Sequence, residues 1–472
     1  MGAGAVFGRA PAARGLCFFL CLGLLVMAAC TGAEDDDEPE LRVGDVRGET
    51  PPVDSPPNIL FFVTDDQFKG TMAAMPRTRS WFEDQGTRFT NAIVSSPLCC
   101  PSRASILSGR YVHNHGVLRN ELGSELDQGS TIEKYLGDAG YQTAIAGKFL
   151  QGIDGRVDPP HWDKWATSLW GYYNANFNVD GEFGPVDPYS VDFVRQRGKQ
   201  FLRRTEKDDD RPWFLYLAPV APHLPYTPAD RHAGAPVPRL RVTPPFTEED
   251  RSDKPEFVQS QNYTLEEGKR QRAKMIRTLM SVDEMVDAIM KQLGKLDEQR
   301  TTLAVFLSDN GHSLGQHGLF AKRLPYRSAV EVPFLMRWPG QVAEGETSDR
   351  LVSTVDLLPT VLHAAGIDPL ERYPLDGRSL LSSWDRPHVL VEQFGNDIKD
   401  LPDWASLRSH SFQYTEYRRD GELVLREYYD MERDPWQLEN LLGDDSEEND
   451  PDIEELETAL EEARSCEGAS CP

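Results

Sequence analysis

The chain has 472 residues, a formal net charge of −26 and a hydrophobic fraction of 39%. This length suits one large domain with a smaller one beside it, and the composition is that of a globular protein. The strong negative charge argues against nucleic acid and anionic membrane surfaces as partners. A polyanionic ligand would therefore need a locally basic site.

The N-terminus is predicted to be an export signal that ends at residue 30. Two arginines precede an apolar run over residues 16–29, which is short for a membrane span. The run ends in Met-Ala-Ala-Cys, which resembles a bacterial lipobox with Cys30 as the lipidated residue, although Met27 stands where Leu is preferred. Ordinary signal cleavage at the same place is the alternative. We expect a secreted protein or a cell-surface lipoprotein, with residues 31–56, acidic and Pro-rich, as a flexible tether.

Four continuous apolar runs are predicted to be buried strands. They cover residues 58–64, 141–146, 213–217 and 303–307. Helical patterns lie between or after them, over residues 131–138 with Ser130 as the cap, 269–296 and 354–365. Because strands alternate with helices, we predict an α/β fold with a large, mostly parallel central sheet flanked by helices.

The pattern changes after about residue 385, where residues 412–417 and 423–429 are predicted to be antiparallel strands. We therefore predict a main domain over residues 57–385 and a small C-terminal α+β subdomain over 386–472.

The last two cysteines, Cys466 and Cys471, enclose a short tail loop. In an exported protein we expect them to form a disulfide. That pairing leaves Cys99 and Cys100 without a disulfide partner.

Polar and ionisable residues follow each predicted strand of the main domain. In chain order these are Asp65 and Asp66, Lys148, His223, and Asp309 with Asn310. Since ligands of parallel α/β sheets bind at the carboxyl ends of the strands, we expect these residues to share one site. Three clustered aspartates need a balancing cation, and an oxygen-only ligand set suits Ca²⁺ or Mg²⁺ rather than Zn²⁺.

The most informative segment is CCPSRASILSGR, which begins at Cys99. Pro101 suits the first position of a short helix and Gly109 suits its C-terminal cap. Arg103 lies one helical turn after Cys99 and should face the same site. The segment fits the pattern C-x-P-S-R-x-x-x-L-[ST]-G-[RK], at which sulfatases have their Cys oxidised to formylglycine. It therefore resembles a sulfatase active-site motif.

Other segments resemble the sulfatase family in the family's own order, from about residue 57 to residue 441. Residues 57–67 resemble the opening strand with its metal-binding aspartate pair, and residues 140–148 resemble the second family signature. Residues 308–311 resemble the second metal-binding strand end. The sequence is identified as a member of the formylglycine-dependent sulfatases, which share the alkaline-phosphatase type of fold.

The resemblance implies that a formylglycine-generating enzyme matures Cys99 and that a divalent cation, calcium or alternatively magnesium, completes the site. The implied metal ligands are Asp65, Asp66, Asp309, Asn310 and the modified Cys99. One hydroxyl of the hydrated aldehyde would attack sulfur, and the other would release the sulfate. The implied partners of the sulfate oxygens and the leaving alcohol are Arg103, Lys148 and Lys322, with His223 as the acid. Contacts to sulfate or sugar are assigned to His115 and His312.

Within the family, several details resemble the N-acetylglucosamine-6-sulfatase branch. They include the segment 113–116, the terminal cysteine pair, and Leu150 at a position where arylsulfatases commonly have His. The expected substrate is the 6-O-sulfate of N-acetylglucosamine or glucosamine residues in a glycosaminoglycan or similar glycan. The alternatives are an arylsulfatase or other carbohydrate sulfatase, a phosphoric ester hydrolase of the same superfamily, and a non-catalytic glycan-binding surface protein.

Overall fold

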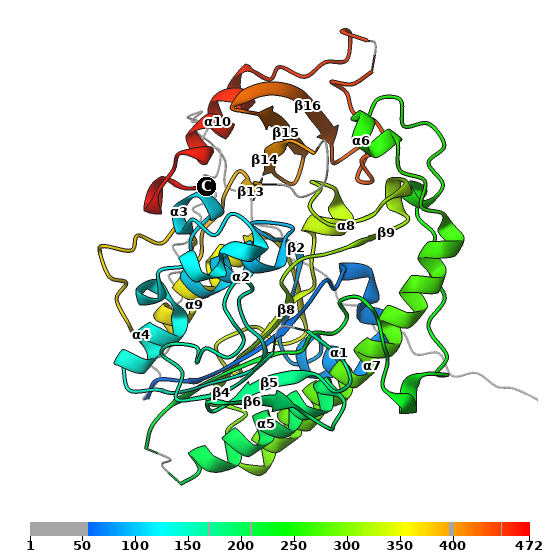
Figure 1. Cartoon of the computed structure of the whole chain (residues 1–472). Helices are drawn as coiled ribbons and strands as arrows, with labels where there is room; N and C mark the ends of the chain where they lie inside the picture. The colour runs from blue at the N-terminus through cyan, green and yellow to red at the C-terminus, as the bar shows by residue number, and fades with distance from the viewer. Residues whose placement is uncertain (1–54, 169, 208–209, 396–400, 445) are drawn as a thin grey trace, which may run out of the picture. The chain divides into compact units, whose positions relative to one another are not determined.

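A ten-stranded mixed sheet carries the fold (Figure 1). In this computed structural model the strands lie in the order β12-β2-β11-β8-β1-β7-β3-β4-β5-β6. The structure describes residues 55–168, 170–207, 210–395, 401–444 and 446–472. The predicted export signal with Cys30, and nearly all of the predicted tether, lie outside the described residues.

The four strands predicted from apolar runs lie side by side in this sheet. They are β1 (Asn58–Thr64), β3 (Gln142–Lys148), β7 (Trp213–Ala218) and β8 (Thr302–Ser308). β1 pairs in parallel with β7 and β8, and β7 pairs in parallel with β3. Their carboxyl ends therefore lie along one edge, as the alternation of strands and helices predicted.

Further strands extend the sheet and make it mixed. β4 continues in parallel beside β3, whereas β5, β6 and β11 pair in the antiparallel sense and β12 runs parallel to β2. Their bounds are β2 (Thr87–Ile93), β4 (Lys164–Ser168), β5 (Asn176–Val179), β6 (Glu182–Pro185), β11 (Phe334–Arg337) and β12 (Glu346–Ser353). The prediction of a parallel sheet holds for its central strands, and the outer pairings are mostly antiparallel.

Helices cover both faces of the sheet (Figure 1). Alternate residues of β1 enter two separate cores: Phe61 packs with α2, α4 and α9, and Phe62 packs with α1, α5 and α7. This alternation follows from the two-residue repeat of a strand buried on both faces. The helices are α1 (Pro76–Phe82), α2 (Cys99–Ser108), α4 (Ile132–Asp138), α5 (Ser190–Thr205), α7 (Leu265–Lys295) and α9 (Leu357–Ala365).

Short elements complete the connections. The remaining helices are α3 (Val112–His115), α6 (Glu256–Gln259), α8 (Arg327–Val330) and α10 (Glu454–Arg464). Residues Ser313–Leu314 (β9) and Phe320–Ala321 (β10) form a two-stranded ribbon. The 3₁₀ helices used below are η1 (Lys69–Ala74) and η6 (Gln316–Gly318).

The predicted helix starts differ from the structure. α7 begins at Leu265 rather than at residue 269, and α9 begins at Leu357 because residues 354–356 form a 3₁₀ turn. The N-cap of α4 is Thr131 rather than Ser130, because the Ser130 hydroxyl donates back to the Asp127 carbonyl and Ser130 belongs to a preceding 3₁₀ turn. In α2 the helix already begins at Cys99, so Pro101 is its third residue rather than its first. Pro is tolerated there because the first-turn N–H groups have no partner within the helix.

A four-stranded antiparallel sheet lies near the C-terminus, in the order β13-β14-β15-β16. Its strands are β13 (Val389–Gln393), β14 (Asp403–Arg408), β15 (Phe412–Arg419) and β16 (Glu422–Asp430). The two predicted antiparallel strands of this part are confirmed as β15 and β16. The domain boundary at residue 385 stays a prediction.

The C-terminal tail packs beside α3 (Figure 1). Cys466 and Cys471 form the expected disulfide, and Cys99 and Cys100 are free. The carbonyl oxygen of Cys466 accepts hydrogen bonds from His113 Nε2 and Asn114 Nδ2, both at 2.9 Å. The tail therefore supports the segment that directly follows α2.

None of the helices in the described part of the chain is both long enough and apolar enough to cross a membrane.

Gly147 in β3 allows the close approach that sets Lys148 in place. Its φ is +113°, and a Cβ atom there would lie 2.0 Å from the carbonyl oxygen of Ala218 in β7. We expect Gly147→Ala to lower the free energy of unfolding by about 3 kcal/mol, because the clash is with backbone and the conformation is strained. Urea unfolding measures the change. Gly137→Ala is the control, since Gly137 is exposed in α4 with nothing within 4 Å of the added atom, and an equal loss in both variants would contradict the argument.

Candidate active site

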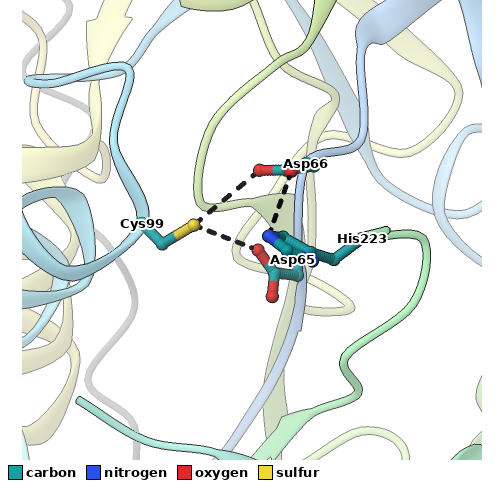
Figure 2. A group of neighbouring side chains, drawn as sticks. All are labelled: Asp65, Asp66, Cys99 and His223. Atoms are coloured by element: carbon teal, nitrogen blue, oxygen red, sulfur yellow. Dashed lines mark hydrogen bonds and ion pairs between the residues drawn. The ribbon is translucent and has the colours of Figure 1, made fainter. Parts of the chain in front are cut away.

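The residues predicted at the strand ends meet at one edge of the sheet. Figure 2 shows Asp65, Asp66, Cys99 and His223 pointing toward one another. One ligand atom from each of these four residues lies within 4.8 Å of the other three. The aspartates follow β1, Cys99 begins α2, and His223 lies in the loop after β7. The sheet and one helix N-terminus together assemble the cluster.

The Cys99 thiol lies at the centre of the cluster. Its Sγ is 3.3 Å from Asp65 Oδ1 and 2.8 Å from Lys322 Nζ, and the residue is fully buried. Burial, together with the neighbouring Asp65, raises the pKa of this thiol far above its usual range, so unmodified Cys99 is neutral and a poor nucleophile. Sγ is bonded directly to Cβ, as the oxygens of a formylglycine hydrate would be. It therefore marks the position that one of those oxygens would take.

Two side chains of α2 hold that helix to the end of β8. The Ser102 hydroxyl donates to the carbonyl oxygen of Asp309, and Arg103 Nε donates to Asp309 Oδ2 at 2.8 Å. Arg103 also donates to the Lys148 carbonyl oxygen, whereas its Nη2 is buried and has no partner in the part of the chain that the structure describes. The Ser-Arg pair of the sequence pattern thus aligns α2 with the strand ends and leaves one donor unused.

Three ion pairs balance the three carboxylates of the site. They are Arg103 with Asp309 at 2.8 Å, Lys148 with Asp65 at 2.6 Å, and Lys322 with Asp66 at 2.6 Å. From the sequence alone, the carboxylates were expected to need a cation to balance their charge. In the structure these basic side chains already supply the balance, so the case for a cation must rest on the ligand atoms instead.

The ion pairs decide the protonation of two of the carboxyl groups. Burial opposes ionisation of Asp65 and Asp66, but Lys148 next to the first and Lys322 next to the second outweigh it. The pKa of Asp65 is lowered, and that of Asp66 is lowered to about 2. Burial and the neighbouring Asp65 raise the pKa of Asp309 to about 6. Asp65 and Asp66 are therefore anionic well below neutral pH, whereas Asp309 becomes anionic only as the pH rises through about 6.

The ligand atoms fit a hard divalent cation. Asn310 Nδ2 donates to Asp66 Oδ1 and to a backbone carbonyl, while the Oδ1 of Asn310 is buried and has no hydrogen-bond partner among the residues that the structure describes. An unpaired buried amide oxygen beside two carboxylates is the kind of oxygen set that Ca²⁺ and Mg²⁺ bind. Asp309 is placed differently, because its Oδ1 accepts from two backbone N–H groups and its Oδ2 from Arg103.

His223 joins the cluster through its Nε2, which is 3.5 Å from Asp66 Oδ2. Its Nδ1 is 2.9 Å from the carbonyl oxygen of Leu224, so Nδ1 carries the hydrogen and Nε2 is the atom that faces the cluster. Sequence reasoning assigned His223 to proton donation only. Its position among the possible metal-ligating atoms was not foreseen.

The two histidines assigned to sulfate or sugar differ in position. His115 does not reach the cluster: its Nε2 pairs with Ser105 Oγ at 3.0 Å and its Nδ1 accepts from the N–H of Val117. Burial lowers its pKa to about 3, so it packs as a neutral ring behind α2. His312 lies closer, since Asp66 and Lys322 both act on its charge. Burial lowers the pKa of His312 to about 4.

Trp170 is a neighbour of the site that the sequence analysis missed. Its ring is 45% exposed, lies 4.9 Å from Lys148 Nζ and is 4.8 Å from the ring of His223. An exposed tryptophan over two site residues offers a flat face to a ligand. No sequence signal marks it, because it lies in an irregular stretch between β4 and β5.

Comparison with known families and proteins agrees with this geometry. The profile of the family "Sulfatase" matches residues 57–367, and a second one, "N-sulphoglucosamine sulphohydrolase, C-terminal", matches residues 315–465. The chain belongs to the sulfatase family. The N-acetylglucosamine-6-sulfatase of Homo sapiens is 31% identical over 88% of this chain and 86% of its own length. The family assignment made from the motifs is confirmed.

Other relatives differ in size or share the fold alone. A Caenorhabditis elegans homolog of the extracellular sulfatase Sulf-1 is 35% identical over 70% of this chain, which spans 49% of the relative's length. One similar solved structure holds its substrate D-glucosamine-2-N,6-O-disulfate. It superposes with a TM-score of 0.74 at 22% identity, covering 86% of this chain and 96% of the other. This likeness supports the fold.

Proposed function

We propose that this sulfatase hydrolyses the 6-O-sulfate of N-acetylglucosamine or glucosamine residues in a sulfated glycan, with a formylglycine made from Cys99 and one divalent cation. The observation that carries the proposal is the position of Cys99 Sγ between the Asp65 carboxylate and the Lys322 ammonium. The identity with the human N-acetylglucosamine-6-sulfatase over most of both chains supports the substrate.

The proposed modification and cation add what the other side chains lack. A hydrated formylglycine at position 99 supplies a nucleophilic hydroxyl and a second hydroxyl through which sulfate is released. The cation, most simply Ca²⁺, supplies positive charge that favours ionisation of that hydroxyl. Asp65, Asp66, Asn310 and residue 99 would hold it, with His223 and Asp309 beside them.

Basic side chains would bind the sulfate group. Lys148 and Lys322 are paired with the carboxylates of Asp65 and Asp66. A cation on those carboxylates would compete for the same oxygens and leave both ammonium groups available for sulfate. Arg103 Nη2 is a buried donor that is already free. Cation and sulfate ester are therefore expected to bind cooperatively, and each basic group would stabilise the charge that spreads over the sulfate oxygens.

His223 is the proposed acid for the leaving sugar alcohol. Its Nδ1–H is held by the Leu224 carbonyl, which leaves Nε2 to carry a proton toward the site. The loop is also fixed from the other side, because the Tyr172 hydroxyl donates to the His223 carbonyl at 2.6 Å. Trp170 packs against the ring and would face the sugar.

The setting of the enzyme belongs to the same proposal. We place it outside the cytoplasm, exported by its N-terminal segment, with Cys30 as a lipid attachment site or simple cleavage as the alternative. A formylglycine-generating enzyme is its required partner. A phosphoric ester hydrolase and a non-catalytic glycan-binding protein are the rival functions, and neither requires an aldehyde at residue 99.

The first prediction concerns the maturation of Cys99. Peptide mass spectrometry of active enzyme should show residue 99 with sulfur and two hydrogens lost and one oxygen gained, and a hydrazide probe should label it. Cys100 is the internal control and should keep its thiol. Cys99→Ser should be inactive in turnover. An intact Cys99 thiol in fully active enzyme would refute the formylglycine proposal.

The second prediction concerns the cation. Asp66→Asn keeps the side-chain shape and tolerates the left-handed backbone of this residue, with φ at 68°. We expect it to reduce the bound divalent cation from about one per chain to none and to lower kcat by about 10²-fold or more. Elemental analysis and kinetics measure both effects. Asp283→Asn, a buried aspartate that caps α1, is the control and should retain the cation.

The third prediction concerns the substrate. The value of kcat/KM should be higher for 6-sulfated N-acetylglucosamine than for a 4-sulfated galactosamine or a simple aryl sulfate. Lys322→Ala should lower turnover of all three by about 10²–10³-fold, because the sulfate group is common to them. Trp170→Ala should lower kcat/KM for the saccharides more than for the aryl sulfate. A wild-type preference for either comparison substrate would leave the sulfatase assignment standing and exclude the glucosamine one.

A further inference from the structure

A cavity of about 420 Å³ lies beside the catalytic cluster and contains none of its residues. Its walls come from segments that follow the cluster along the chain: η1 after Asp66, η6 after Asn310, and the start of α8 after Lys322. Phe68, in its wall, is two residues from Asp66, so their Cα atoms are at most about 7 Å apart. The wall of the cavity therefore begins near the cluster.

The cavity is basic in a protein that is strongly acidic overall. Five basic side chains and one carboxylate line it, in a chain of net charge −26. The carboxylate, Glu331, is already paired with Lys69 at 3.2 Å and Arg327 at 2.9 Å. Two more of the basic residues, Arg239 and Arg241, are exposed. They form no ion pair with any residue that the structure describes. The wall thus carries uncompensated positive charge.

The fifth basic residue, Arg272 of α7, is buried and forms no ion pair within the described parts of the chain. It is 5% exposed, its Nη1 donates to the Pro238 carbonyl at 2.8 Å, and its Nε is buried with no hydrogen-bond partner there. Three other buried arginines of the described chain, Arg103, Arg386 and Arg408, each pair with a carboxylate, as Arg386 pairs with Asp356 at 2.6 Å, whereas Arg337 has only carbonyl and amide partners. A guanidinium held out of water without an anion is costly, and burial lowers the pKa of Arg272 accordingly. An anionic ligand would remove that cost.

The rest of the wall combines the polar residues Thr243, Gln316, His317 and Ser328 with a larger apolar part. The apolar part is partly aromatic and includes Phe68, Leu240, Phe246 and Trp436. A bare inorganic ion would leave these surfaces without a partner, whereas a sugar ring has a C–H face that packs on aromatic side chains. The combination favours an anion carried on a ring.

We propose that this cavity binds a second anionic sugar residue, sulfated or uronic, of the glycan whose 6-O-sulfate lies at Cys99. The anionic group would bind Arg272, with Arg239 and Arg241 at the rim, and the ring would pack on Phe68 and Phe246. This inference rests on the proposed function. It would make the enzyme prefer glycans in which a sugar near the hydrolysed residue carries an anionic group. This preference adds to the selectivity for the sulfate that is removed.

The kinetic test compares two substrates in matched variants. The probes are 6-sulfated N-acetylglucosamine and a sulfated tetrasaccharide of glucosamine and uronic acid. Arg272→Gln should lower the ratio of kcat/KM for the tetrasaccharide to that for the monosaccharide by about 10-fold or more. Arg270→Gln is the control, since its side chain is 74% exposed on the same helix, and it should leave the ratio unchanged. An unchanged ratio in folded Arg272→Gln would overturn the proposal.

A binding test separates this inference from the proposed function. In a Cys99→Ala background, calorimetric titration with the same tetrasaccharide should show about 10-fold weaker binding after Arg272→Gln, and Arg272→Lys should restore part of it. This binding measurement requires no hydrolysis. It can therefore still be interpreted if the 6-sulfatase assignment fails. Inorganic sulfate is the third probe. If Arg272→Gln weakens inorganic sulfate and the tetrasaccharide equally, the cavity is a simple anion site and the saccharide assignment is wrong.

Discussion

The candidate active site is held together by three buried ion pairs that each join two elements of the fold. Arg103 with Asp309 ties α2 to the end of β8, Lys148 with Asp65 ties β3 to β1, and Lys322 with Asp66 ties the segment before α8 to β1. The carboxylates are at most 1% exposed. Because a charge left alone in such a place is strongly destabilising, each pair fixes the position of both partners. The central sheet and α2 are thus locked at the point where their polar ends meet.

The same pairing bears on the proposed function. The ammonium groups of Lys148 and Lys322 pair with the aspartates, and the thiol of Cys99 lies between Asp65 and Lys322. In the proposed function, a divalent cation would add positive charge where the carboxylates meet, and an incoming sulfate ester would be the anion that restores neutrality. The basic cavity lined by Arg272 would extend this logic to a second anion outside the cluster. Local basic sites would let a protein of charge −26 bind the polyanionic glycan that we propose as its substrate.

Much of this arrangement could be predicted from the sequence because it depends on local patterns. The run at 58–64 had to be a strand buried on both faces, and the aspartates after it had to lie at the edge where β8 also ends. The motif at Cys99 placed Arg103 on the correct face of its helix. The helix starts were less certain, since Ser130 and Thr131 are both good caps and only the preceding turn decides between them.

Contacts between distant segments could not be predicted in this way. Trp170 reaches the cluster only through the folding of the stretch between β4 and β5, and nothing in its neighbourhood along the chain marks it. Histidine is a residue type that often contacts ligands, yet the position of His115 on α3 directs both ring nitrogens to Ser105 and Val117. The charge balance was also missed, because the sequence shows the three aspartates but not which basic side chains face them.

The burial of Cys99 has a consequence for the order of events during synthesis. In the finished fold its side chain is entirely covered, and the segment after α2 is held by the Cys466 carbonyl, which lies 353 residues after His113. A ribosome has released nearly the whole described chain before that contact can form. An enzyme that acts on residue 99 must therefore reach the nascent or still unfolded polypeptide, and the speed of folding sets the time available to it.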